Sequence, residues 1–212
     1  MNGHCPGRGN PTREQNPAYE LLQPIIPTRR IEQGLNNVDD QLLWNLGFTR
    51  LNDLYSGYSR ETELALALLL TRYCQAKEAL AAVIAEIDAS SVCHQCGGQC
   101  CLNGKYRINV CDSLVLIARE TIPSVNFIQK PVCPYGSQDG CSMEPGLRPV
   151  DCILFICDAI NEKLSPQSRT ILVAGEQGLR ECIEQASRLT GERLRTPLLL
   201  WAEEQKTINP KV

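Results

Sequence analysis

The sequence predicts a mainly α-helical protein, a small helical domain around a loop-rich, cysteine-coordinated metal centre. Three observations lead to this prediction. Apolar residues recur at helical spacing in two long stretches of good helix formers, which flank the middle of the chain. The middle is rich in Pro and Gly, so core packing alone is unlikely to hold its shape. The same middle part holds most of the 12 cysteines among the 212 residues.

These observations divide the chain into four regions. Residues 1–35 carry scattered Pro and Gly without apolar periodicity and are expected to be irregular. Residues 36–90 form a first helical segment, and residues 161–212 form a C-terminal helical segment. Residues 91–160 lie between them as the cysteine-cluster, metal-binding region.

The first helical segment should contain one long helix. Ser59 is a suitable N-cap for a helix from Arg60 to about Asp88. Before it, Gly47 and Gly57 predict short helices with breaks at these glycines. Cys74 lies on or beside the apolar stripe of the long helix, so it is expected in the core.

Shorter or interrupted helices are expected later in the chain. Asp112 or Ser113 could cap a helix from Leu114 to about Glu120. Ser165, which precedes a proline, should begin a C-terminal helix that stops at Gly191.

The interior of that C-terminal helix contains two weak points. Gly175 and Gly178 favour a split into two helices. Cys182 lies on the apolar stripe and is expected in the core. The stretch "TPLLLWAEEQ" should close the chain as a short apolar helix or strand.

Composition argues against several classes of function. The net charge of -3 and the pI near 5.5 provide no basic field for nucleic acid. No apolar run approaches the length of a membrane span, and the start of the chain has no apolar leader. We therefore expect a cytoplasmic protein in which clustered thiols are reduced. With only 2 histidines, any metal site must rely on sulfur.

Eight cysteines form two groups, which are the candidate metal ligands. The groups are Cys93, Cys96, Cys100 and Cys101, and Cys133, Cys141, Cys152 and Cys157. Sets of four thiolates bind structural zinc or iron–sulfur clusters, and Cys-x2-Cys suits both. Adjacent side chains diverge, so Cys100 and Cys101 favour two centres or one cluster that draws on both groups. The alternative is that one of this pair is a buried spacer.

Other interpretations of the cysteines remain open at this point. Disulfides are the main alternative, and the expected reducing compartment argues against them. A redox relay through Cys93 and Cys96 lacks its usual βαβ context. His94 could lie beside the ligands but is not counted among them.

The cysteine pattern resembles a known family. "CHQCGGQCC", followed by "CPY", "GCS" and "RPVDCILFIC", is similar to the bacterial YkgJ-type cysteine-cluster proteins, with their CxxCxxxCC signature. The resemblance spans about Cys93 to Cys157. It implies a zinc- or iron-chelating domain whose ligands are the eight cysteines of the two groups. "MEPG" stands where the family usually carries an aromatic residue.

These features predict a metal-binding protein whose fold is stabilised by zinc or iron, including an iron–sulfur cluster. Arg148 is the candidate for a neighbouring guanidinium that offsets the negative charge of the thiolates. One alternative is an iron–sulfur enzyme, because the signature also resembles part of the flagellin lysine methylases. Another is a metal-stabilised module that binds a protein partner, which the sequence does not identify.

Overall fold

The computed structural model describes residues 37–96, 101, 104–127, 133–137 and 140–208. The segment predicted to be irregular, residues 1–35, lies outside these ranges. The described residues all belong to one unit, which begins at Asn37.

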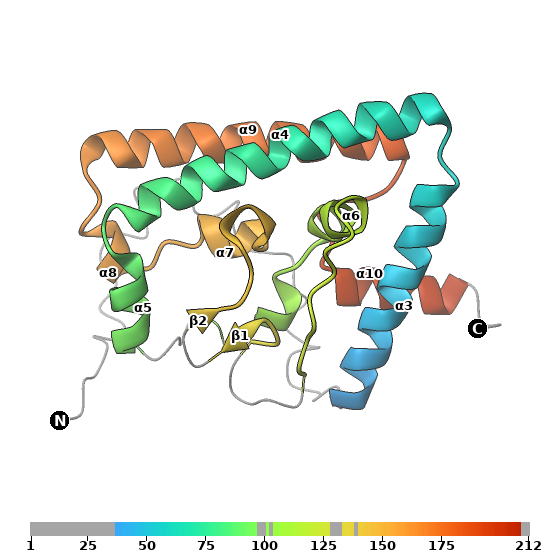
Figure 1. Ribbon diagram of the computed structural model, residues 1–212, viewed down its shortest axis with the longest axis horizontal. Helices are drawn as coiled ribbons and strands as arrows, with labels where there is room; N and C mark the ends of the chain where they lie inside the picture. Colours follow the sequence, from blue (N-terminus) through green and yellow to red (C-terminus); the bar gives the residue numbers. More distant parts are fainter. Residues whose placement is uncertain (1–36, 97–100, 102–103, 128–132, 138–139, 209–212) are drawn as a thin grey trace. The chain divides into compact units, whose positions relative to one another are not determined.

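The prediction of a mainly α-helical fold is confirmed (Figure 1). The helices are α3 (Asn37–Ser56), α4 (Arg60–Ala85), α5 (Ala89–Cys96), α6 (Val110–Ala118), α7 (Val150–Leu154), α8 (Asp158–Asn161), α9 (Pro166–Thr190) and α10 (Leu198–Ile208). Two 3-10 turns are η2 (Gly104–Tyr106) and η3 (Pro145–Leu147), and two short strands are β1 (Gly136–Ser137) and β2 (Gly140–Cys141).

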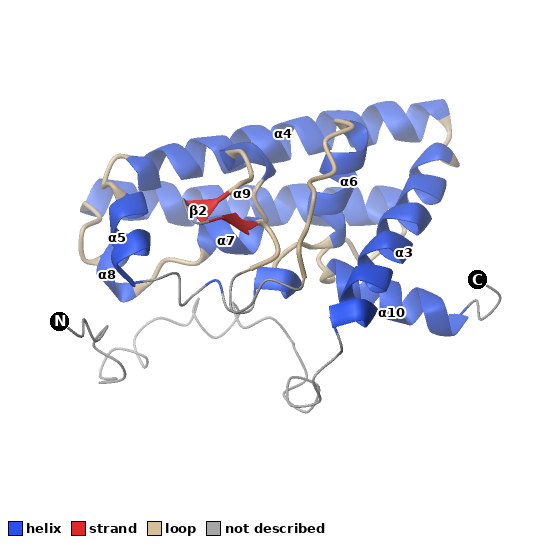
Figure 2. Cartoon of the chain, turned by 60° about the horizontal axis from the view of Figure 1, so that its bottom comes forward, coloured by secondary structure: helices blue, strands red, loops and turns tan. Residues whose placement is uncertain are grey.

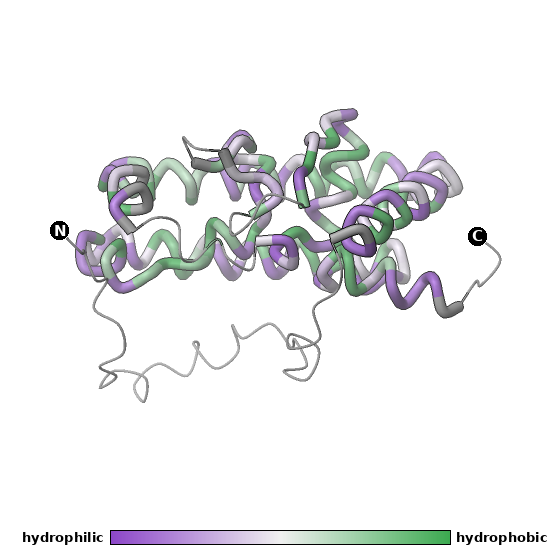
Figure 3. The backbone as a smooth tube through the Cα atoms, turned by 90° about the horizontal axis from the view of Figure 1, so that it is seen from below, coloured by the Kyte–Doolittle hydropathy of each residue, from purple (hydrophilic) through white to green (hydrophobic). Residues whose placement is uncertain are grey.

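The long helices α4 and α9 pack side by side and run in opposite directions (Figure 1). The Ser59 side chain accepts a hydrogen bond from the Thr62 backbone N–H and begins α4 as predicted. Ser165 caps α9 in the same way, and Gly191 ends it with a left-handed φ of 74°. Hydrophobic and hydrophilic residues alternate along these helices, which matches a buried and a solvated face (Figure 3).

Helices α3, α6 and α10 pack together beside this pair. Their shared core includes Trp44, whose ring lies near the rings of Phe48, Phe127 and Tyr135 at 4.6, 5.9 and 5.7 Å. Helix α6 is buried almost throughout, and Cys111 lies within it. Cys74 and Cys182 are buried in the same core, as predicted.

The segment from Cys133 to Cys157 contains only short elements. Strands β1 and β2 form an antiparallel hairpin that pairs Gly136 with Cys141 (Figure 2). Both η3 and α7 contact α4, which places the segment below the long helices. Elements this short have little intrinsic stability, so their positions depend on tertiary contacts.

Two predicted helix breaks were wrong, because packing overrides the low helix propensity of glycine. Helix α3 continues through Gly47, where a Cβ atom would lie 2.8 Å from Leu198 Cδ1. Helix α9 continues through both Gly175 and Gly178. Gly47 and Gly175 therefore serve as close-approach points between helices.

Two helix boundaries also need correction. Helix α6 begins earlier than predicted, because Asn109 is its N-cap and Asp112 completes a capping box. Cys93 and Cys96 belong to the region that was predicted to be loop-rich, but they lie on α5. The closing stretch is helical, as α10. No helix in the described part of the chain is long and apolar enough to cross a membrane.

The two glycines of α9 provide a matched test of helix packing. At Gly175 a Cβ atom would lie 2.3 Å from the buried Leu80 side chain, whereas at Gly178 nothing lies within 4 Å. We expect Gly175→Ala to lower the free energy of unfolding by about 1–3 kcal/mol through overpacking. Gly178→Ala should raise it by about 0.5–1 kcal/mol through helix propensity. Urea unfolding of both variants measures the difference, and equal effects would contradict the close packing of α4 on α9.

Candidate functional site

The structure brings the two cysteine-rich stretches into one region. Helix α5, which carries Cys93 and Cys96, contacts β2, which ends at Cys141. The same helix contacts α8, which begins directly after Cys157 (Figures 1 and 2). Cys93 and Cys96 are three residues apart on α5, which is a spacing at which residues lie on the same face of a helix. The side chains of Cys93, His94, Cys96 and Cys100 lie outside the described residues.

Three thiols of the second group lie close enough to influence one another electrostatically. Burial raises the pKa of Cys133, the Tyr135 backbone N–H lowers it, and the nearby Cys141 raises it again. Burial also raises the pKa of Cys152, and Cys133 and Cys141 add to that increase. Cys152 still reaches solvent, although protein atoms surround it on several sides. A negative charge on one of these thiols therefore disfavours the thiolate form of its neighbour.

The three thiols do not by themselves form a closed site. Among the described residues, no three Cys, His, Asp or Glu side chains converge closely enough to hold a metal ion. Thiols free of disulfides occur at Cys74, Cys111, Cys133, Cys141, Cys152, Cys157 and Cys182. The structure thus shows a partial grouping, and α5 contacts it through β2.

The remaining candidate ligands differ in their surroundings. Cys101 is exposed. Cys157 is partly buried and packs against a small apolar cluster that includes Ala89 and Val92 of α5. A packing role is therefore sufficient to explain Cys157, and the same cluster includes residues of α5.

Close packing fixes Cys133 from one side. At Gly104 in η2, an added Cβ atom would lie 2.2 Å from Cys133 Cβ and 2.8 Å from its Sγ. Since both atoms belong to a buried residue, any side chain at position 104 would displace Cys133. The turn η2 therefore sets the position of this thiol.

Tyr135 carries a buried hydroxyl beside the thiols. It is 1% exposed, and in the described part of the chain its hydroxyl has no hydrogen-bond partner. Burial raises the pKa of Tyr135 well above its usual value, and the nearby Cys133 and Cys152 raise it further. A buried donor without an acceptor costs about 1–3 kcal/mol, so this hydroxyl destabilises the structure as it stands.

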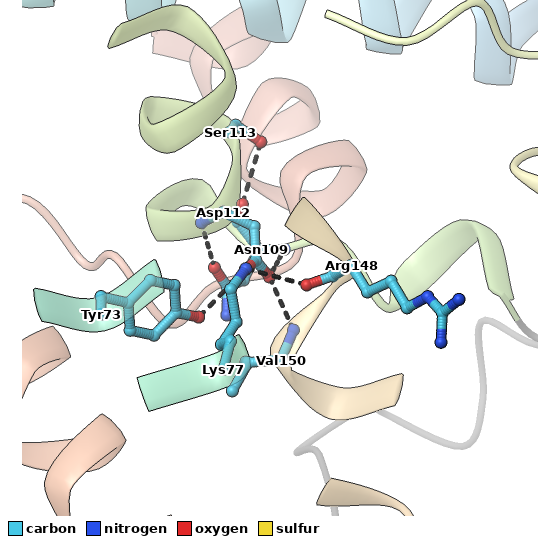
Figure 4. Close-up of polar contacts among 7 residues, drawn as sticks. All are labelled: Tyr73, Lys77, Asn109, Asp112, Ser113, Arg148 and Val150. Carbon is cyan, nitrogen blue, oxygen red and sulfur yellow. Dashed lines mark hydrogen bonds and ion pairs between the residues drawn. The ribbon is translucent and has the colours of Figure 1, made fainter. Parts of the chain in front are cut away.

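A buried ion pair joins α4 and α6 (Figure 4). Lys77 Nζ of α4 donates to Asp112 Oδ1 of α6 at 2.7 Å, and both side chains are 0% exposed. The Tyr73 hydroxyl donates to the same oxygen at 3.0 Å. The Asn109 side chain accepts a hydrogen bond from the Asp112 backbone N–H at 2.8 Å, so the carboxylate is oriented by its own helix cap.

This pair also fixes the chain before Cys152. Lys77 Nζ donates to the Arg148 carbonyl at 2.8 Å, and the Val150 backbone N–H donates to Asp112 Oδ2 at 3.1 Å (Figure 4). Pro149 lies between these two bonds and has no N–H to satisfy. The Arg148 carbonyl and the Val150 N–H therefore have hydrogen-bond partners on α4 and α6. Cys152 follows Val150 by two residues.

Arg107 is the arginine whose charge acts on both Cys133 and Cys152, and the sequence did not suggest it. Its charge lowers the pKa of both Cys133 and Cys152. Arg148 was the sequence candidate for this role. Its Nε donates to the Met143 carbonyl at 3.1 Å, and its own carbonyl receives Lys77.

The sequence did contain a signal for the ion pair. Lys77 interrupts the buried stripe of α4, and Asp112 interrupts the apolar run of α6. Charged residues are almost never fully buried unless they are paired. A lysine and an aspartate that each interrupt an apolar stripe therefore indicate that the two form an ion pair. Arg107 offered no comparable signal, because it precedes α6 in a half-buried loop position.

Removal of Lys77 should be costly. Lys77→Met leaves the Asp112 carboxylate buried without its counter-ion, and we expect the free energy of unfolding to fall by about 3–5 kcal/mol. The exposed pair of Arg60 and Glu63 is the control, with side chains 74% and 38% exposed. Arg60→Met should cost less than about 1 kcal/mol. Urea unfolding of both variants under the same conditions measures the two losses in free energy of unfolding.

A double variant identifies the cause of that loss. Lys77→Met with Asp112→Asn removes both charges and should cost less than the sum of the two single changes. Additive losses would contradict a coupled ion pair between these residues.

Comparison of the chain with protein-family models, with curated proteins and with solved structures finds no match. The case for a function therefore rests on the residues and geometry described above.

Proposed function

We propose that this chain is a thiolate metal-binding protein that uses zinc or iron, the latter alone or as an iron–sulfur cluster. The observation that carries the proposal is the contact of α5, which carries Cys93 and Cys96, with β2, which ends at Cys141. The electrostatic effects between Cys133, Cys141 and Cys152 agree with this placement. These thiols come from a turn, a strand and a helix that are separate in sequence. Helix α5, with Cys93 and Cys96, contacts the same region.

The charge balance of the grouping supports a cation. Desolvation and the neighbouring thiols raise the pKa values of Cys133 and Cys152. A bound metal ion reverses this effect, because it stabilises the thiolate form and releases the proton. An all-sulfur donor set suits zinc and iron–sulfur clusters rather than magnesium or calcium. When bound, the metal would supply a cross-link between these segments.

The shortness of the local elements supports a stabilising role for that cross-link. Both strands span 2 residues, and α7 spans 5. A metal that joins Cys133, Cys141 and Cys152 would tie this segment to itself. The ligands that complete the site would come from Cys93, Cys96, Cys100, Cys101 and Cys157, the set that the family resemblance implies. Metal binding would then add to the stability of the folded form of residues 91–160.

The proposal is tested by a pair of cysteine variants. Cys152→Ser should lose bound metal, because it removes a proposed ligand. Cys182→Ser changes a buried cysteine of α9 and should keep the full metal content, with a packing cost of about 1 kcal/mol. Both proteins are purified without oxygen and measured by elemental analysis and absorption spectroscopy. Equal metal content in wild type and Cys152→Ser, or no metal in the wild type, would overturn the proposal.

Tyr135→Phe tests whether the orphaned hydroxyl faces the metal ligands. In metal-free protein the change should raise the free energy of unfolding by about 1 kcal/mol, because it removes a buried donor that lacks an acceptor. In metal-loaded protein the gain should disappear, because metal-bound thiolates accept hydrogen bonds. Urea unfolding with and without zinc gives both values. The same gain in both states would show that the hydroxyl does not contact the ligands.

A further inference from the structure

Arg107 connects the segments that carry Cys133 and Cys152. Its backbone N–H donates to the Gly104 carbonyl at 3.0 Å, which closes the turn η2. Gly104 in that turn is packed directly against Cys133. The position of Arg107 is therefore linked through one short turn to the position of the first thiol.

The side chain of Arg107 extends to α7 and holds it at two points. Its Nη1 donates to the Asp151 carbonyl at 3.2 Å. Its guanidinium lies 4.8 Å from the centre of the Phe155 ring, which follows the last residue of α7. Cys152 lies between these two anchor residues in sequence.

Both contacts suit a guanidinium. The Asp151 carbonyl also accepts the Phe155 backbone N–H at 3.1 Å. A carbonyl oxygen has two lone pairs, so it can accept the guanidinium as well. The planar guanidinium can donate in its plane while its face stacks on a ring, which a lysine ammonium cannot do.

We propose that Arg107 is the positioning residue of the thiolate site: it holds α7, which carries Cys152, against the turn η2, which packs on Cys133. This inference rests on the proposed metal-binding function. The sequence pointed to Arg148 as the arginine beside the thiolates, and Arg107 would be the arginine that orients them.

Arginine variants test the inference through zinc affinity, measured by competition with a chelator. Arg107→Gln removes both the charge and the fork and should weaken zinc binding about 10–100-fold, the range for groups that orient metal ligands. Arg107→Lys keeps the charge and should lose less affinity. Phe155→Leu removes only the stacking surface and, since the ring is 43% exposed, should remain folded with a smaller loss. The control is Arg188→Gln, whose side chain is 71% exposed and should leave affinity unchanged.

A second readout separates positioning from general stability. Cobalt replaces zinc, and the sulfur-to-cobalt absorption bands report the ligand geometry. We expect Arg107→Gln and Arg107→Lys to shift these bands, while Arg188→Gln leaves them unchanged. Far-ultraviolet circular dichroism confirms that each variant keeps its helices.

The outcomes distinguish this inference from the proposed function. If Arg107→Gln and Phe155→Leu bind zinc like the wild type while Cys152→Ser does not, the role of Arg107 is overturned and the metal site stands. If none of these variants changes zinc binding, the metal site itself is overturned.

Discussion

The buried ion pair between Lys77 and Asp112 is the interaction on which the other features depend. It joins α4 to α6 in a place where neither charge contacts solvent. Isolated, either charge would be strongly unfavourable, so the two helices must adopt the register in which the pair forms. The same two side chains match the Arg148 carbonyl and the Val150 N–H. One pair thus determines both the helix packing and the path of the chain before Cys152.

The candidate site follows from this arrangement by short steps. The ion pair sets the start of α7, Arg107 contacts Asp151 and Phe155 on either side of Cys152, and Gly104 of η2 packs against Cys133. These contacts position Cys133 and Cys152 through residues that lie outside residues 133–157. A rigid frame of this kind is what a metal site needs, because ligands must be held near their binding geometry before the ion arrives. The segment can then hold its cysteines in defined positions even though its strands and its helix α7 are short.

The sequence was most informative where structure depends on neighbouring residues. The caps Ser59 and Ser165 and the stop at Gly191 were predictable, because capping is a local interaction. Gly47 and Gly175 were misread as breaks, because their roles depend on Leu198 and Leu80 from distant helices. The cysteine groups were visible from spacing, but the contact of α5 with β2 and α8 was not. Arg107 could not be found at all, since its two contacts depend on how η2 and α7 approach each other.

X-ray absorption at the edge of the bound metal tests the central claim most directly, because it reports which atoms coordinate the ion. The measurement uses the full chain purified without oxygen. We predict a coordination shell made of sulfur, at about 2.3 Å for zinc, or sulfur with a neighbouring iron for a cluster. A shell dominated by nitrogen and oxygen, or a protein that contains no metal, would contradict the account.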